Sequence, residues 1–293
     1  MDTPSSPVYN TIVTPPGLLN DVIFKIVFGT PQNTSVLRAL LNALLGLSGS
    51  DRIIELEILN PMASTEYVLD RGVILDVKSR DAQGRLYNIE VQVAREPDYI
   101  NRSVYYLARL FSEQLSRGEP YSEIARTVAI SLLDYLLFED VPDLHSIYRF
   151  YDKVHDRQLS DILEIHYIEL IKFQQNKPNS LRTPFEKWLH VLKFGDLYES
   201  EQTVVPEALV QEEGIDMALK SMRRAYASDE VREIIEARLK AQRDEASRLE
   251  HATQQGVQQG VQETEQRIAR RMMEQGVDSA IIFHATGLRP DQF

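Results

Sequence analysis

Two short segments in the first third of the chain alternate apolar and polar residues, which is the pattern of a β-strand with one buried face. They span residues 72–78 and 87–93, and Gly84 between them is free to adopt the left-handed conformation of a tight turn. The pattern therefore predicts an antiparallel hairpin centred on Gln83. Its buried face would carry Val73, Leu75, Val77, Ile89, Val91 and Val93.

The register of this hairpin brings two acidic residues together. Counting outward from Gln83 pairs Asp76 with Glu90, Lys78 with Asn88, and Ile74 with Gln92. Two carboxylates that face each other across a sheet repel, so the pair destabilises the sheet unless a cation lies between them. We therefore expect Asp76 and Glu90 to bind a metal ion.

The sequence also allows simpler roles for these acids. Asp76 could form a salt bridge with Lys78 or Arg71 at a sheet edge, and Glu90 could pair with Lys78 diagonally across the hairpin. Asp21 precedes the first apolar segment, where it could be a plain helix N-cap or a third carboxylate brought beside the hairpin. Three oxygen ligands, with water completing an octahedron, would suit Mg2+.

The overall composition restricts the class of protein. With 293 residues, 43% hydrophobic and 26% charged, the chain is an ordinary globular protein of one or two domains. It contains no cysteine, which excludes disulfides and thiolate chemistry. It has no apolar run long enough to cross a bilayer and no secretory signal, so we expect a cytoplasmic protein without a membrane partner. The net charge is −12 and neither half is basic, so any contact with nucleic acid must use a local patch or a metal ion.

The remaining hydrophobic pattern predicts an α/β fold. Residues 22–28 suit a buried short helix, although a strand also fits, and residues 35–47 have helical spacing. Further expected elements are a strand at 52–59, a helix from Pro97 to Gly118, a central strand at 126–133, a strand pair at 147–151 and 162–171, and a short helix at 185–194. On the helix after the hairpin, the expected buried stripe is Ile100, Val104, Leu107, Phe111 and Leu115.

Composition divides the chain into three parts. Residues 1–17 are rich in Pro, Ser and Thr and are expected to form a flexible arm. Residues 18–200 hold the α/β pattern, and residues 201–293 are mostly helix formers with a Gln/Gly repeat at 255–262. Each glycine weakens a lone helix by about 1 kcal/mol. We therefore expect the tail to be extended, exposed or paired.

Several motifs together resemble the PD-(D/E)XK nuclease superfamily. They are Asn20-Asp21-Val22-Ile23-Phe24-Lys25, Leu75-Asp76-Val77 and Asn88-Ile89-Glu90-Val91-Gln92. The chain more closely resembles the bacterial recombination-promoting nuclease (Rpn), or transposase, branch, because later segments also match. These are residues 102–106, 114–121 and 168–173, and the Gln/Gly tail. The resemblance implies a restriction-endonuclease-like core, a mixed central sheet flanked by helices, with a mostly helical C-terminal extension.

The resemblance also implies a metal-dependent reaction. Asp76 and Glu90 would be the metal-binding acids of a Mg2+-dependent DNA endonuclease, and Asp21 would be a helper from the first helix. Such a metal could generate hydroxide and stabilise charge on a phosphate oxygen.

One position departs from the pattern of the wider superfamily. Gln92 stands where that superfamily has a lysine, and glutamine can orient a water molecule but supplies no positive charge. Lys78, on the same predicted face, or Lys25, one turn after Asp21, could supply that charge. Lys25 could equally be an ion-pair partner of Asp21 along the helix.

Partners follow from the same resemblance. Arg102 and Tyr106 share a face of the helix after the hairpin and could hold a phosphate or brace Glu90, or be a plain exposed arginine and packed tyrosine. The implied partner is DNA, with a role in recombination or mobile-element biology and a homodimer formed through the helical tail. The closing helices at 268–288 could instead contact DNA. The alternative function is a catalytically inactive nuclease fold that serves as an interaction protein, which the acidity and the missing lysine permit.

Overall fold

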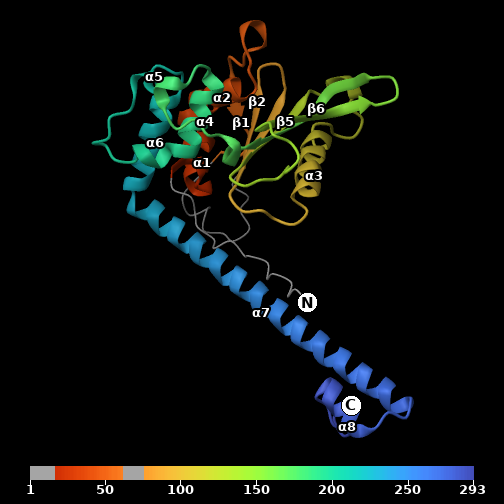
Figure 1. Ribbon diagram of the computed structural model, residues 1–293. Helices are drawn as coiled ribbons and strands as arrows, with labels where there is room; N and C mark the ends of the chain where they lie inside the picture. Colours follow the sequence, from red (N-terminus) through yellow and green to blue (C-terminus); the bar gives the residue numbers. More distant parts are fainter. Residues whose placement is uncertain (1–16, 62–75) are drawn as a thin grey trace. The chain divides into compact units, whose positions relative to one another are not determined.

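The computed structural model describes residues 17–61 and 76–293. Helices and strands of the α/β core follow the order expected from the sequence (Figure 1). They are α1 (Asp21–Gly29), α2 (Thr34–Leu44), β1 (Leu56–Ile58), β2 (Val77–Asp81), β3 (Leu86–Gln92), α3 (Tyr99–Ser112), β4 (Thr127–Leu133), β5 (His145–Asp152), β6 (Arg157–Glu169) and α4 (Pro184–Phe194). The first apolar segment is thus a helix. Asn20, not Asp21, caps it by accepting the backbone N–H groups of Val22 and Ile23.

A mixed six-stranded sheet forms the centre of the fold, with the strand order β1-β2-β3-β4-β6-β5. Strands β1, β2 and β3 pair antiparallel, β3, β4 and β6 run parallel, and β5 returns antiparallel at the edge. Strand β4 lies inside the sheet and is buried along its whole length. This confirms the expected central strand, and the pairing of β5 with β6 confirms the second strand pair.

Helices cover both faces of the sheet (Figure 1). On one face, α1, α2, α4 and a later helix, α6 (Ile215–Ala227), pack over the largest apolar core. On the opposite face α3 covers a smaller core that is rich in tyrosine. The restriction-endonuclease-like architecture expected from the sequence is confirmed. Because both faces are covered, a polar side chain that projects from the middle of the sheet needs a partner.

The β2–β3 hairpin has the expected register. Lys78 pairs with Asn88 and Val77 with Ile89, and Gly84 in the turn has a φ of 80°. Val77 and Ile89 are fully buried on the face covered by α1. Residues 72–75 lie outside the described residues, so the pairing of Ile74 with Gln92 stays a prediction.

The structure corrects the expected buried face of α3. Ile100 and Val104, which the hydrophobic pattern favours as core residues, are 42% and 49% exposed. Leu107 is buried as expected, but the other buried positions are Tyr99, Ser103 and Leu110. The helix is therefore rotated by about one residue, roughly 100°. The rotation brings the hydroxyl of Tyr99 to Glu90 and the hydroxyl of Ser103 to Tyr167. If apolar side chains faced the sheet instead, these buried polar groups of Glu90 and Tyr167 would lose a hydrogen-bond partner.

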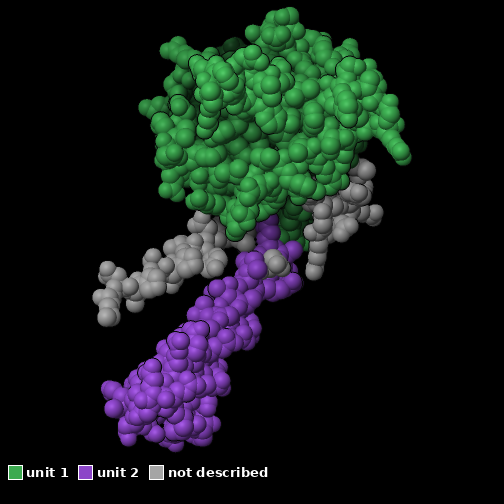
Figure 2. Space-filling model, turned by 90° about the vertical axis from the view of Figure 1, so that its right-hand side faces the viewer, with its two compact units in different colours: residues 1–238 green, residues 239–293 purple. Residues whose placement is uncertain are grey.

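The C-terminal region contains α5 (Glu207–Val210), α6, α7 (Asp229–Glu274) and α8 (Ser279–Thr286). The chain divides into two compact units, residues 1–238 and 239–293 (Figure 2). Helix α6 and the first turns of α7 contribute Leu219, Val231 and Ile234 to the core of the first unit. The second unit therefore begins after Arg238, later than the change in composition at residue 201.

The second unit consists of the rest of α7 followed by α8. Helix α7 continues without interruption through Gly256 and Gly260, both of which are exposed. Near its end, Ala269 is buried, as is Ile282 of α8. None of the described helices has the length and apolarity that crossing a membrane requires.

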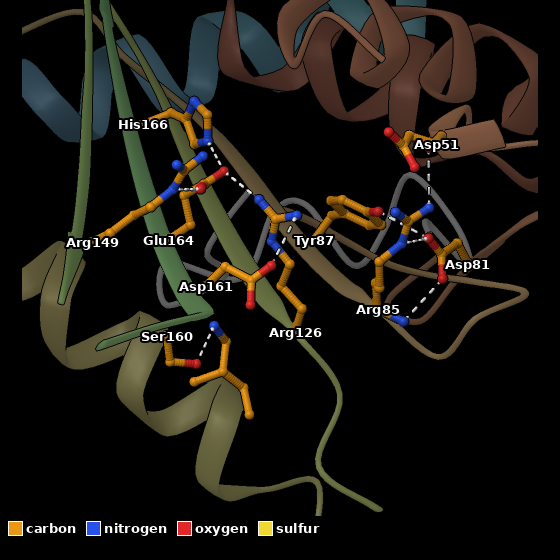
Figure 3. Close-up of polar contacts among 11 residues, drawn as sticks. Asp51, Asp81, Arg85, Tyr87, Arg126, Arg149, Ser160, Asp161, Glu164 and His166 are labelled. Atoms are coloured by element: carbon orange, nitrogen blue, oxygen red, sulfur yellow. Dashed lines mark hydrogen bonds and ion pairs between the residues drawn. The ribbon is translucent and has the colours of Figure 1, made fainter. Parts of the chain in front are cut away.

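A buried acid on β6 organises a polar cluster on the α1 face of the sheet (Figure 3). Glu164 is 2% exposed and accepts hydrogen bonds from Arg126, Arg149 and His166. Burial works to raise the pKa of Glu164, but the hydrogen bonds from His166 and Arg149 outweigh it and lower the pKa to about 2. Asp161 also lies near Arg126, so the two acids of the cluster offset the charges of its two arginines.

Candidate metal centre

The two acids of the hairpin lie on the face of the sheet that α3 covers. Glu90 projects from β3 toward Tyr99 of α3. Asp76 immediately precedes β2, and the pairing of Lys78 with Asn88 continues to place Asp76 opposite Glu90. Each acid is 7% exposed. Opposed residues of an antiparallel pair share a face, so the two carboxylates project to the same side.

The electrostatics of the two acids reflect this placement. Burial raises the pKa of Glu90, and the charge of Asp76 raises it further, against hydrogen bonds from Tyr99 and Gln92 and the charge of Arg102. Burial likewise raises the pKa of Asp76, although the charges of Lys78 and Lys25 oppose it. Two buried carboxyl groups whose charged forms are disfavoured lower the stability of the sheet. Groups of this kind are typical of functional sites.

The side chain of Asn60, just after β1, holds Asp76 in place. Its amide nitrogen donates to the main-chain oxygen of Asp76 and to Asp76 Oδ1, both at 3.1 Å. Its side-chain oxygen accepts the backbone N–H of Lys78 at 2.7 Å. Asn60 thus connects the end of β1 to the start of β2 by hydrogen bonds. It fixes both the backbone and one carboxylate oxygen of Asp76.

Lys25 of α1 reaches the same point from the other side of the strand. Its ammonium donates to the main-chain oxygens of Asn60 at 2.7 Å and Asp76 at 2.6 Å. Its aliphatic stem lies over Gly29, where a Cβ atom would come within 2.8 Å of Lys25 Cδ. Burial lowers the pKa of Lys25 to about 8, against the charge of Asp76. Lys25 is therefore part of the site, although its hydrogen bonds go to main-chain oxygens.

Asp21 occupies a different position from the one expected for a third ligand. Its carboxylate accepts a hydrogen bond from Arg238 Nε at 2.6 Å and one from the backbone N–H of Val22. Across residues 17–61 and 76–293, no three acidic or histidine side chains are close enough to share a metal ion. The structure therefore does not gather Asp21, Asp76 and Glu90 into one three-carboxylate site. The reason is geometric, since Lys25 and not Asp21 is the α1 residue that reaches β2.

The two remaining residues of the sequence pattern lie beside the acids. Lys78 Nζ is 3.9 Å from Asp76 Oδ2, and its side chain is 39% exposed. Gln92 lies two residues beyond Glu90 on β3, where it works to lower the pKa of Glu90 against burial. Lys78 thus offers a solvent-accessible positive charge at the site, whereas Gln92 supports the carboxylate.

Residues of α3 surround Glu90 on its other side. The Tyr99 hydroxyl donates to Glu90 Oε1 at 2.5 Å. The Arg102 guanidinium lies 5.2 Å from the centre of the Tyr99 ring and also pairs with Glu96. The charge of Arg102 works to lower the pKa of Glu90, against burial. Tyr106 is half-buried, and its ring packs against Tyr105 at 5.8 Å.

Two of these residues, Asn60 and Tyr99, escape detection in the sequence. Asn60 stands in an Asn-Pro pair that reads as an ordinary turn signal. Tyr99 lies one residue before the apolar stripe that the periodicity favours. The two contacts depend on the rotation of α3 and on the separation of β1 from β2. Neither quantity is encoded in local sequence.

The donor set fits a divalent cation that prefers oxygen ligands. Asp76 and Glu90 would supply carboxylate oxygens, and Gln92 would supply an amide oxygen on the same face. On that face, Asn88 Oδ1 is buried without a hydrogen-bond partner in the described part of the chain. An orphaned oxygen two residues from Glu90 is consistent with a hydrated ion at this position, because a bound water molecule would satisfy it.

Comparison with known proteins agrees with the geometry. Neither a curated protein nor a solved structure matches the chain at a significant level. A family model described as "PD-(D/E)XK nuclease family transposase" matches residues 18–252, which is most of the chain and includes every residue of the site. The fold, the paired acids and this match agree, and the chain belongs to the PD-(D/E)XK nuclease family of transposases.

Proposed function

We propose that this protein is a Mg2+-dependent DNA endonuclease that hydrolyses phosphodiester bonds and acts in recombination or in the movement of mobile elements. The observation that carries the proposal is the pair Asp76 and Glu90, two buried acids at opposed positions of the hairpin on one face of the sheet. Family membership supports a nuclease linked to mobile elements, and nucleases of this superfamily generally use divalent metal ions.

Asp76 and Glu90 would hold the ion, which when bound supplies hydroxide at neutral pH and neutralises charge on the phosphate. The protein's own groups prepare the site for it. Asn60 and Lys25 immobilise Asp76, the first through its carboxylate and both through its main-chain oxygen. Lys78 is the exposed cation nearest to Asp76 among the described residues, so we assign to it the contact with the scissile phosphate.

The test is the conversion of supercoiled plasmid to nicked or linear DNA by the purified protein. We expect cleavage with Mg2+, none with EDTA, and recovery when Mg2+ is added back in excess. The double variant Asp76→Asn/Glu90→Gln, purified in parallel, controls for contaminating nuclease and should leave the plasmid intact. A folded wild-type protein that leaves DNA intact under all these conditions would instead support the catalytically inactive interaction protein.

The two lysines of the site can be tested separately. We expect Lys78→Met to lower the saturating cleavage rate by about 100-fold, because an exposed positive charge beside the phosphate is lost. Lys25→Met should lower cleavage as well, because the main-chain oxygen of Asp76 would lose one of its hydrogen-bond donors and Asp76 would move. Lys220→Met, an exposed lysine of α6, is the matched control and should retain full activity. If neither site variant loses activity, no lysine replaces the one missing at Gln92.

DNA is the partner that membership in this family implies, and we propose that the protein acts on it as a homodimer. The exposed part of α7 supports this arrangement, because Val257 and Val261 are 61% and 51% exposed on a helix that two glycines weaken. Sedimentation equilibrium of the full chain would show a dimer if the proposal holds and a monomer if it does not.

A further inference from the structure

We infer that Tyr99 is a positioning residue that fixes the Glu90 carboxylate for binding the metal ion, an inference that rests on the proposed metal-dependent function. The Tyr99 hydroxyl donates to Glu90 Oε1 at 2.5 Å, and both side chains are buried. The contact joins the first turn of α3 to β3, so it links the helix that closes the site to the strand that carries the acid.

The tyrosine itself is held in one orientation. The rings of Tyr135 and Tyr167 pack edge-on against it, each with its centre 6.4 Å away. The Arg102 guanidinium lies 5.2 Å from the ring centre. Ser131 lies beside the Tyr99 hydroxyl, where it works to lower the pKa of the phenol that burial raises. A phenol fixed on all these sides is a rigid donor, and it cannot follow the carboxylate if Glu90 moves.

This rigidity matters because the last torsion of a glutamate is soft. Rotation of a carboxylate about its terminal bond is broad and nearly two-fold, so packing alone does not set the direction of its oxygens. Tyr99 occupies Oε1 and thereby sets the direction in which Oε2 points. Side chains that orient metal ligands in this way typically affect metal affinity by about 10- to 100-fold.

The neighbouring Tyr135 provides a matched comparison. It is also buried and packs against the same ring, but its hydroxyl has no hydrogen-bond partner in the described part of the chain. Tyr99→Phe and Tyr135→Phe therefore remove the same atom from the same aromatic cluster. Only the first change removes a hydrogen bond to Glu90.

The experiment is a binding isotherm of the full-length protein with Mn2+ alone, measured by calorimetry without DNA. We expect Tyr99→Phe to weaken Mn2+ binding by about 10- to 100-fold and Tyr135→Phe to leave it within about twofold of wild type. In cleavage assays, Tyr99→Phe should raise the Mn2+ concentration needed for half-maximal rate, while the rate at saturating Mn2+ stays close to that of the wild type. Ser131→Ala, a second variant, should weaken Mn2+ binding in the same direction by a smaller factor.

The outcomes separate this inference from the proposed function. If the wild type binds no Mn2+, the metal-dependent function fails and the inference fails with it. If the wild type binds Mn2+ and Tyr99→Phe binds it equally well, only the role of Tyr99 is overturned. Equal weakening in Tyr99→Phe and Tyr135→Phe would also overturn it, because the effect would then come from packing of the tyrosine cluster.

Discussion

Replacing Glu90 with glutamine is expected to abolish DNA cleavage and, at the same time, to make the protein more stable. Burial and the charge of Asp76 raise the pKa of Glu90, so at pH 7 its charged form is less favourable in the folded protein than in the unfolded chain. A neutral glutamine removes that penalty and still accepts the Tyr99 hydroxyl. We expect the free energy of unfolding to rise, and cleavage to fall by about a thousandfold or more, as when a single catalytic group is lost.

Both effects can be measured on one preparation. Urea unfolding at pH 7 without metal gives the stability, and the initial rate of plasmid nicking with Mg2+ gives the activity. Glu57→Gln changes an exposed acid of β1 in the same sheet and should alter neither quantity. A Glu90→Gln protein that cleaves at the wild-type rate would remove Glu90 from the reaction. A loss of stability would show that the acid pair is favourable without a cation.

The same substitution at Glu164 is expected to have the opposite effect on stability. Glu164 is 2% exposed and binds Arg126, Arg149 and His166, contacts that hold its pKa at about 2. The difference from its ordinary value of 4.5 corresponds to about 3 kcal/mol, so Glu164→Gln should lower the free energy of unfolding by about that amount. The two arginines would keep their charges without the buried counter-charge.

The pH dependence of stability gives an independent check on Glu164. A carboxyl group with a lowered pKa stabilises the folded state above its unfolded pKa, near 4.5, and that stability is lost as the pH falls toward about 2. Glu164→Gln should therefore show a shallower loss of stability between pH 4.5 and the acid limit than the wild type. Asp161→Asn removes the exposed acid of the same cluster and should change stability by less than about 0.5 kcal/mol. Cleavage per folded molecule should stay at the wild-type level in both variants.

Glu90 and Glu164 illustrate how similar residues acquire different roles. Both are buried acids on strands of one sheet, and both follow the same alternating pattern in sequence. One faces an acid across the hairpin, and the other faces two arginines from neighbouring strands. The sequence identifies the first situation because the hairpin is local. In the second, Arg149 also comes from a hairpin partner, β5, but the β5–β6 pairing is irregular between Tyr148 and Phe150. Arg126 precedes β4, and β4 meets β6 only when the sheet assembles.

The sequence by itself determined the β2–β3 hairpin, its register and therefore the opposition of Asp76 and Glu90. Alternation has a strict period of two, and the turn at Gly84 allows one register, so short-range information is sufficient. Only the tertiary structure decided that Lys25 and not Asp21 reaches the site, and that Tyr99 and not Ile100 faces the sheet. The rotation of a helix about its axis is set by everything packed against it. Because the helix repeats every 3.6 residues, the sequence pattern alone does not decide which of two neighbouring positions faces the core; packing against the sheet decides it.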